Sequence, residues 1–133
     1  MSPVTHLLTG WIVANASTRS VRRERAIITV ASVAPDLDGL GIIPELVTRD
    51  SAHPLLWYSQ YHHLLGHNLL FGLIVTLIAF IFGARRSITA GFAFLAFHLH
   101  LLFDLFGSRS PDGYQWPIHY LWPFSDFWQL RQS

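Results

Sequence analysis

The sequence predicts an all-α protein, a four-helix up-down bundle with an irregular aromatic and proline-rich C-terminal segment. Three observations predict this fold class. Half of the 133 residues (51%) are hydrophobic, which is ample for one core, so residues 1–133 are expected to form a single domain. Prolines, glycines and capping residues divide the chain into four long segments. Short turns join consecutive segments, which favours antiparallel neighbouring helices.

The boundaries of the first two helices follow from local signals. Ser2 and Pro3 are a good N-cap and first helical residue, so the first helix is expected from there to about Asn15. The second is expected from about Val21 to Ala34, because the following proline disfavours continuation. Residues 39–54 contain two glycines and two prolines, which predicts a long loop.

The second half of the chain predicts two longer helices. The third is expected over roughly Trp57–Phe82, and the fourth begins after the Ser87 cap and ends at Gly107. Residues 108–133 are rich in proline and aromatic side chains and are expected to be irregular, with at most a short helix near Asp126–Leu130.

The composition indicates an apolar environment. Charged residues make up 13% of the chain, about half of the roughly 25% typical of soluble domains. This favours a membrane or a large apolar interface. The net charge is +1 and every basic residue is arginine, without the basic stripe of a nucleic-acid-binding protein, so no nucleic-acid partner is expected. The lack of cysteine excludes disulfides and thiolate zinc sites.

Two segments approach the length of a membrane-spanning helix, which needs about 20 mostly apolar residues. Residues 64–84 and 87–103 contain no Asp, Glu, Lys or Arg. The alternative is a pair of buried helices in a soluble bundle. Arginines collect in the two turns at one end of the predicted bundle, and the positive-inside rule assigns such an end to the cytoplasm.

A set of histidines and aspartates near the ends of the apolar segments is the main functional signal. The set is His6, Asp36, Asp38, His62, His67, His100 and Asp104. His and Asp are ligands for divalent metals. Antiparallel packing brings the start of the third helix to the end of the fourth, and the start of the first near the end of the second. We therefore expect a polynuclear metal site at one end of the bundle, within roughly 10 Å.

Helical spacing raises the question of whether His62 or His63 is the metal ligand. His63 and His67 are four residues apart, as are His100 and Asp104, and residues at this spacing share a helix face. On spacing alone, His63 is favoured over His62 as the partner of His67.

Other candidates have simpler explanations. Asp36 and Asp38 would also suit a helix-terminating turn. His98 points to nearly the opposite helix face from the other histidine of its segment and is expected to be a packed side chain. His53 and His119 are expected at the surface.

The motifs together resemble the bacterial membrane-bound, metal-dependent hydrolase family of the inner membrane and, more distantly, the helical fold of zinc-dependent phospholipase C. The matching stretches, in order, are Thr5-His6, Pro35 to Asp38, His62 to Asn68, His100 to Asp104, Gly107 and Trp122-Pro123-Phe124. In register with the family, His62 rather than His63 binds the metal. The chain departs from the family at His63, Gly66 and Asn68, where the family has Arg, Thr and Ser.

The resemblance implies a membrane-associated, metal-dependent hydrolase in the inner membrane. Because the arginine-rich end is expected in the cytoplasm, the metal site is expected toward the outer side. Its expected cofactors are two or more divalent ions, with zinc the expected metal. The expected partners are membrane lipid and a small-molecule or lipid phosphoester, attacked by a metal-activated water. Asp36 or Asp38 is the expected general base, because the only glutamates are Glu24 and Glu45. The alternative is a non-enzymatic membrane protein that binds or transports a divalent metal. The oligomeric state stays open.

Overall fold

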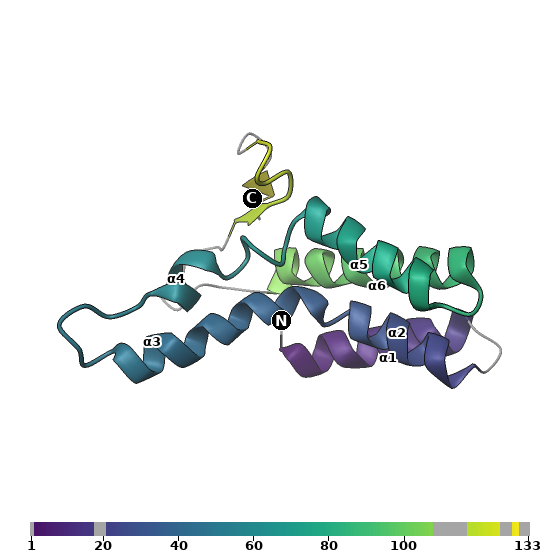
Figure 1. Ribbon diagram of the computed structural model, residues 1–133, viewed down its shortest axis with the longest axis horizontal. Helices are drawn as coiled ribbons and strands as arrows, with labels where there is room; N and C mark the ends of the chain where they lie inside the picture. Colours follow the sequence, from purple (N-terminus) through teal and green to yellow (C-terminus); the bar gives the residue numbers. More distant parts are fainter. Residues whose placement is uncertain (1, 18–20, 108–116, 126–128, 131–133) are drawn as a thin grey trace.

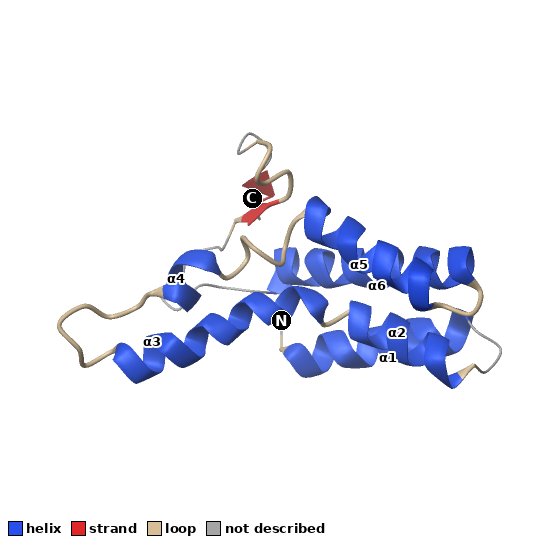
Figure 2. Ribbon diagram, in the orientation of Figure 1, coloured by secondary structure: helices blue, strands red, loops and turns tan. Residues whose placement is uncertain are grey.

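Helices account for most of the residues that the computed structural model describes, which are 2–17, 21–107, 117–125 and 129–130. In chain order they are α1 (Pro3–Ser17), α2 (Arg22–Ala31), the 3-10 helix η1 (Ala34–Gly41), α3 (Ile42–Thr48), α4 (Trp57–Tyr61), α5 (Leu69–Phe82) and α6 (Arg86–Gly107). Two short antiparallel strands, β1 (Ile118–His119) and β2 (Gln129–Leu130), are the regular β-structure of this part of the chain. Figure 2 shows how little strand the fold contains. The predicted all-α class is confirmed.

Four helices pack side by side, namely α1, α2, α5 and α6 (Figure 1). η1 and α3 continue beyond the end of α2, and α4 lies along them. The axis of α2 meets that of η1 and α3 at an angle of 47°. Most of the predicted ligands lie in η1 and in the connection between α4 and α5, at the end of the four packed helices where α2 ends.

Small residues allow these helices to approach closely. Ala14 and Ala96 pack with Ile28 in one buried cluster, and further alanines form a second cluster between α2, α5 and α6. At Gly10 a β-carbon would collide with the hydroxyl of Ser32, whose single proton is shared between the carbonyls of His6 (2.8 Å) and Thr29 (2.7 Å). Glycine is therefore required where α1 crosses the end of α2.

The C-terminal segment is anchored on α5 and α6. Ile118 is fully buried against Phe97 and Leu101. The backbone N–H of Leu69 donates to the carbonyl of Tyr120 at 2.8 Å. The Tyr120 hydroxyl also forms a 3.0 Å hydrogen bond with His98, so His98 is a packed side chain, as predicted.

The predicted continuous helix over Trp57–Phe82 is wrong, because the chain leaves the helical conformation between α4 and α5. His62 is extended, with φ −63° and ψ 135°, and His63 has a positive φ of 68°. α5 then begins anew at an N-cap, where the Asn68 side chain accepts a hydrogen bond from the backbone N–H of Phe71 at 2.8 Å. Asx side chains favour such caps over helix interiors. His63 and His67 therefore do not share a helix face.

The predicted long loop over residues 39–54 is also wrong. η1 and α3 extend the helical structure to Thr48. Pro44 lies in the first turn of α3, where its missing N–H would have no intrahelical partner in any case. In the tail, residues 129–130 form β2 rather than part of a short helix, and residues 126–128 lie outside the described residues. His119 lies in β1 and is half-buried rather than exposed, because it pairs with residue 129 of β2.

An ion pair closes the end of the bundle opposite the ligands. Glu24 is fully buried, and its carboxylate accepts hydrogen bonds from the backbone N–H and the guanidinium of Arg85 at 2.8–3.3 Å. This carboxylate raises the pKa of Arg85 above its usual range. The pair joins α2 to the turn between α5 and α6.

The outer surface of the helices is apolar. Trp11, Leu73 and Leu95 are each 45% exposed or more, on α1, α5 and α6 respectively. Among the described helices, α6 by itself is long and apolar enough to cross a membrane, and α2 with η1 and α3 passes the same test as a bent pair. α5 is apolar but shorter, with 14 residues, because residues 64–68, the first part of the predicted span, are not helical.

Candidate metal centre

The seven predicted side chains meet at one end of the bundle. α1 supplies His6, η1 supplies both aspartates of the Pro-Asp-x-Asp motif, the α4–α5 connection supplies two histidines, and α6 supplies the last pair. Contacts of 2.7–3.6 Å link all seven into one continuous cluster. The convergence expected from antiparallel packing is therefore present.

Asp104 is the centre of this cluster. Its Oδ1 lies 3.0 Å from Nε2 of His6, and its Oδ2 lies 3.1 Å from Nε2 of His100 and 3.2 Å from Nε2 of His67. Nε2 of His63 is 3.7 Å from the same oxygen. These five side chains are at most 2% exposed, so one carboxylate faces four imidazoles in a site screened from solvent.

Hydrogen bonds on the far side of two rings determine where their protons lie. Nδ1 of His67 is 3.0 Å from Oδ2 of Asp38, and Nδ1 of His100 is 2.7 Å from the backbone carbonyl of Ser32. Because both partners are acceptors, each Nδ1 carries the proton in the neutral ring and each Nε2 carries a lone pair. This tautomer is assigned from the hydrogen-bond network.

When both rings are neutral, the two Nε2 lone pairs face each other. Nε2 of His67 and Nε2 of His100 are 3.2 Å apart, with the Asp104 carboxylate beside both. Three electron-rich atoms at this separation repel one another unless a cation or a shared proton lies among them. Nδ1 of His6 and Oδ2 of Asp36 are buried without a hydrogen-bond partner among the described residues. This donor set fits a divalent metal.

Two groups of potential ligands share the central carboxylate. His6, Asp36, His100 and Asp104 form the first group, and His63, His67 and Asp104 form the second. Within each group the ligand atoms all lie within 4.8 Å of one another. Each group could hold a metal ion, and the two groups would share Asp104.

Asp38 lies behind these groups and holds the histidines. Its Oδ1 accepts from Nδ1 of His62 at 2.7 Å, and its Oδ2 accepts from Nδ1 of His67 at 3.0 Å. The backbone N–H groups of His63 and Gly66 donate to Oδ2 at 3.1 and 3.0 Å. A single carboxylate thus fixes both the two rings and the turn between them. Such partners orient metal-binding histidines and raise their basicity.

His62 and His63, between which the sequence left the ligand open, occupy different positions. His62 stacks on Tyr58, with ring centroids 4.6 Å apart, and its side chain is 11% exposed. His63 is buried and stacks on His67 at 4.3 Å. Burial, together with the neighbouring His67 and His62, lowers the pKa of His63 to about 2, so its ring is neutral at physiological pH and retains a lone pair.

A polar pocket of about 310 Å³ opens onto the cluster. Asp36, Gly39, Tyr58 and His62 line it together with Pro3 and Leu40. The Asp36 side chain is 18% exposed, and its Oδ1 lies 3.6 Å from Nε2 of His100. Asp36 therefore lies at the boundary between the buried ligands and the solvent-accessible pocket.

Sequence reasoning missed two parts of this site. The Ser32 carbonyl that holds His100 could not be identified, because a backbone acceptor leaves no mark in the sequence. Tyr58 was missed although it precedes His62 by four residues, a spacing at which side chains are neighbours on a short helix such as α4.

The fold and the site define a class, that of all-α proteins with an apolar outer surface and a buried His/Asp cluster that could hold metal. Comparison with known families agrees. A family model described as YdjM inner membrane protein matches residues 1–132, so the chain belongs to the YdjM inner membrane protein family. The expected inner-membrane location is thereby confirmed. No curated protein and no solved structure matches the chain, so neither hydrolase activity nor a relationship to phospholipase C gains support from these comparisons.

Proposed function

We propose that the protein is a metal-dependent hydrolase of the inner membrane that acts on a phosphoester. The observation that carries the proposal is the pair of ligand groups around Asp104, next to a pocket that admits a small substrate. When bound, divalent metals supply Lewis acidity and lower the pKa of water, which are the two contributions that phosphoester hydrolysis needs. Zinc suits the His and Asp donors of both groups.

The residues of the chain then divide into three roles. His6, His63, His67 and His100, with Asp104 as the shared ligand, would hold two cations. Asp38 would position His62 and His67. Asp36 alone of the two motif aspartates lines the pocket, whereas Asp38 is only 1% exposed and occupied by four hydrogen bonds. Asp36 is therefore the better general base as well as a ligand of the first group.

The position of the cluster along the bundle supports a metal site near the outer face of the membrane. Arg22, Arg23, Arg85 and Arg86 lie at the opposite end, which the positive-inside rule assigns to the cytoplasm. With a rise of 1.5 Å per residue, Asp104 lies about 27 Å along α6 from Arg86, close to the roughly 30 Å thickness of the bilayer core. The pocket would then open near the headgroups of the outer leaflet.

Hydrolysis by the purified full-length protein tests the proposal. Loaded with zinc, the protein should hydrolyse bis(p-nitrophenyl) phosphate, and Asp36→Asn should lower the rate by about a hundredfold or more, as expected for loss of a general base. His98→Ala, outside both ligand groups, is the matched control. Stoichiometric metal binding without hydrolysis, together with metal flux into proteoliposomes, would instead support the alternative of a metal carrier.

A further inference from the structure

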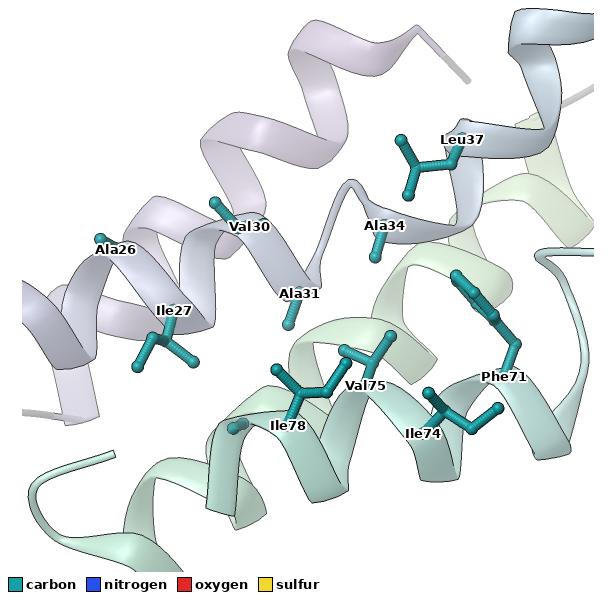
Figure 3. A pocket seen from close by; sticks show the side chains of 11 residues that line it. Ala26, Ile27, Val30, Ala31, Ala34, Leu37, Phe71, Ile74, Val75 and Ile78 are labelled. Atoms are coloured by element: carbon teal, nitrogen blue, oxygen red, sulfur yellow. The ribbon is translucent and has the colours of Figure 1, made fainter. Parts of the chain in front are cut away.

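A second cavity is lined in part by η1, which also contributes to the lining of the polar pocket. This groove has a volume of about 520 Å³ and runs between α2 and η1 on one wall and α5 on the other (Figure 3). Val30, Ala34 and Leu37 line the first wall, and Phe71, Ile74 and Ile78 are among the residues of the second. The described residues that line it all have apolar side chains.

The groove is open along its length. Val30 is 62% exposed, Leu37 is 58%, Ile78 is 49% and Ile74 is 45%. In water an apolar surface of this kind would favour association or aggregation. For a member of an inner-membrane family the surrounding solvent is lipid, and an acyl chain matches such walls without desolvating any polar group.

The groove leads to the metal centre. Leu37 lies between the two aspartates of η1, and Phe71 lies in the first turn of α5, three residues after the Asn68 cap. In a 3-10 helix residues three apart share a face, so the side chains of Ala34, Leu37 and Leu40 form one apolar stripe. Leu40 lines the polar pocket, and the stripe therefore connects the groove with that pocket.

The length of the groove suits one acyl chain. From Phe71 to Ile78 the axis of α5 rises by about 10 Å at 1.5 Å per residue. One leaflet contributes about half of the roughly 30 Å bilayer core. The groove can thus hold the part of an acyl chain nearest the headgroup while the rest remains among neighbouring lipids.

We propose that the groove holds an acyl chain of a membrane lipid whose phosphate headgroup reaches the polar pocket at the metal centre. This inference rests on the proposed function and narrows its substrate class to lipid phosphoesters. The acyl chain contacts the apolar stripe of η1, and Asp36 and His62 face the headgroup. The groove determines which phosphoesters reach the site rather than contributing to the chemistry.

Retention of a non-hydrolysable lipid analogue tests the inference. The probe is tetradecylphosphonate, added to the zinc-loaded full-length protein in detergent, and native mass spectrometry counts the bound molecules. Ile78→Trp fills the groove, and Leu77→Trp is the matched control, because Leu77 is similarly exposed (57%) on α5 but does not line the groove. Wild type and Leu77→Trp should each retain one molecule, and Ile78→Trp should retain at least tenfold less. Val30→Trp repeats the test from the opposite wall.

Three outcomes would overturn the inference: no retention by the wild type, equal retention by the Ile78→Trp and Leu77→Trp variants, or equal retention of tetradecyltrimethylammonium, which has the same chain and a cationic head. Bis(p-nitrophenyl) phosphate has no acyl chain, so its hydrolysis by the wild type and by Leu77→Trp reports on the metal centre without the groove. If the wild type hydrolyses that compound but fails the retention test, the groove assignment alone is wrong. If it retains the probe but never hydrolyses a phosphoester, the proposed function is wrong.

Discussion

Replacement of Asp38 by asparagine distinguishes a metal ligand from a residue that positions ligands. The carboxylate accepts four hydrogen bonds, of which the one from Nδ1 of His67 is 3.0 Å long and fixes the tautomer of a predicted ligand. Asparagine keeps the shape and one acceptor oxygen but removes the negative charge. A hydrogen bond to a charged group contributes about 1.5–3 kcal/mol, which corresponds to roughly a tenfold to hundredfold change in affinity. Changes to the partners of metal-bound histidines have effects in the same range.

The assay is equilibrium dialysis of the detergent-purified protein against zinc, followed by elemental analysis. Asp38→Asn should weaken binding by that factor, yet at saturating zinc it should hold as many ions as the wild type. Asp104→Asn should hold fewer ions, because both ligand groups share Asp104. Asp50→Asn is the control, since that side chain is 90% exposed. A reduced number of ions in Asp38→Asn at saturation would refute the positioning role and make Asp38 a ligand.

The remaining predictions concern metal content, packing and orientation. His67→Ala should lower the bound metal measured by elemental analysis, whereas His98→Ala should leave it unchanged; equal loss in both would contradict the ligand groups. Gly10→Ala should destabilise the protein by about 1–3 kcal/mol through overpacking, but Gly91→Ala, with no atom within 4 Å of the added β-carbon, should stabilise it by about 0.5–1 kcal/mol, both measured by unfolding in detergent. A cysteine at Ser87 should react with an impermeant maleimide only in inverted vesicles, and labelling only in right-side-out vesicles would reverse the orientation.

The two aspartates of the Pro-Asp-x-Asp motif show that a sequence pattern can identify functional residues without determining the role of each one. Both aspartates were expected as ligands and as candidate bases. In the structure they point in different directions, because a 3-10 helix separates residues two apart by more than half a turn. Asp36 therefore faces the pocket and His100, while Asp38 faces the turn that contains His62 and His67. Their spacing alone contained no information about this division.

The sequence by itself determined the class of the fold and the end of the bundle at which the predicted histidines and aspartates gather. It could do so because apolar composition, caps and short turns are local properties, and antiparallel neighbours follow from short connections. Only the tertiary structure decided how the chain passes from α4 to α5. Helix propensity and apolar pattern favour a continuous helix there, but the Asn68 cap and the bonds from His63 and Gly66 to Asp38 stabilise a break. Because these bonds join residues 25 and 28 positions apart, no local window contains them, and the positions of His62 and His63 depend on them.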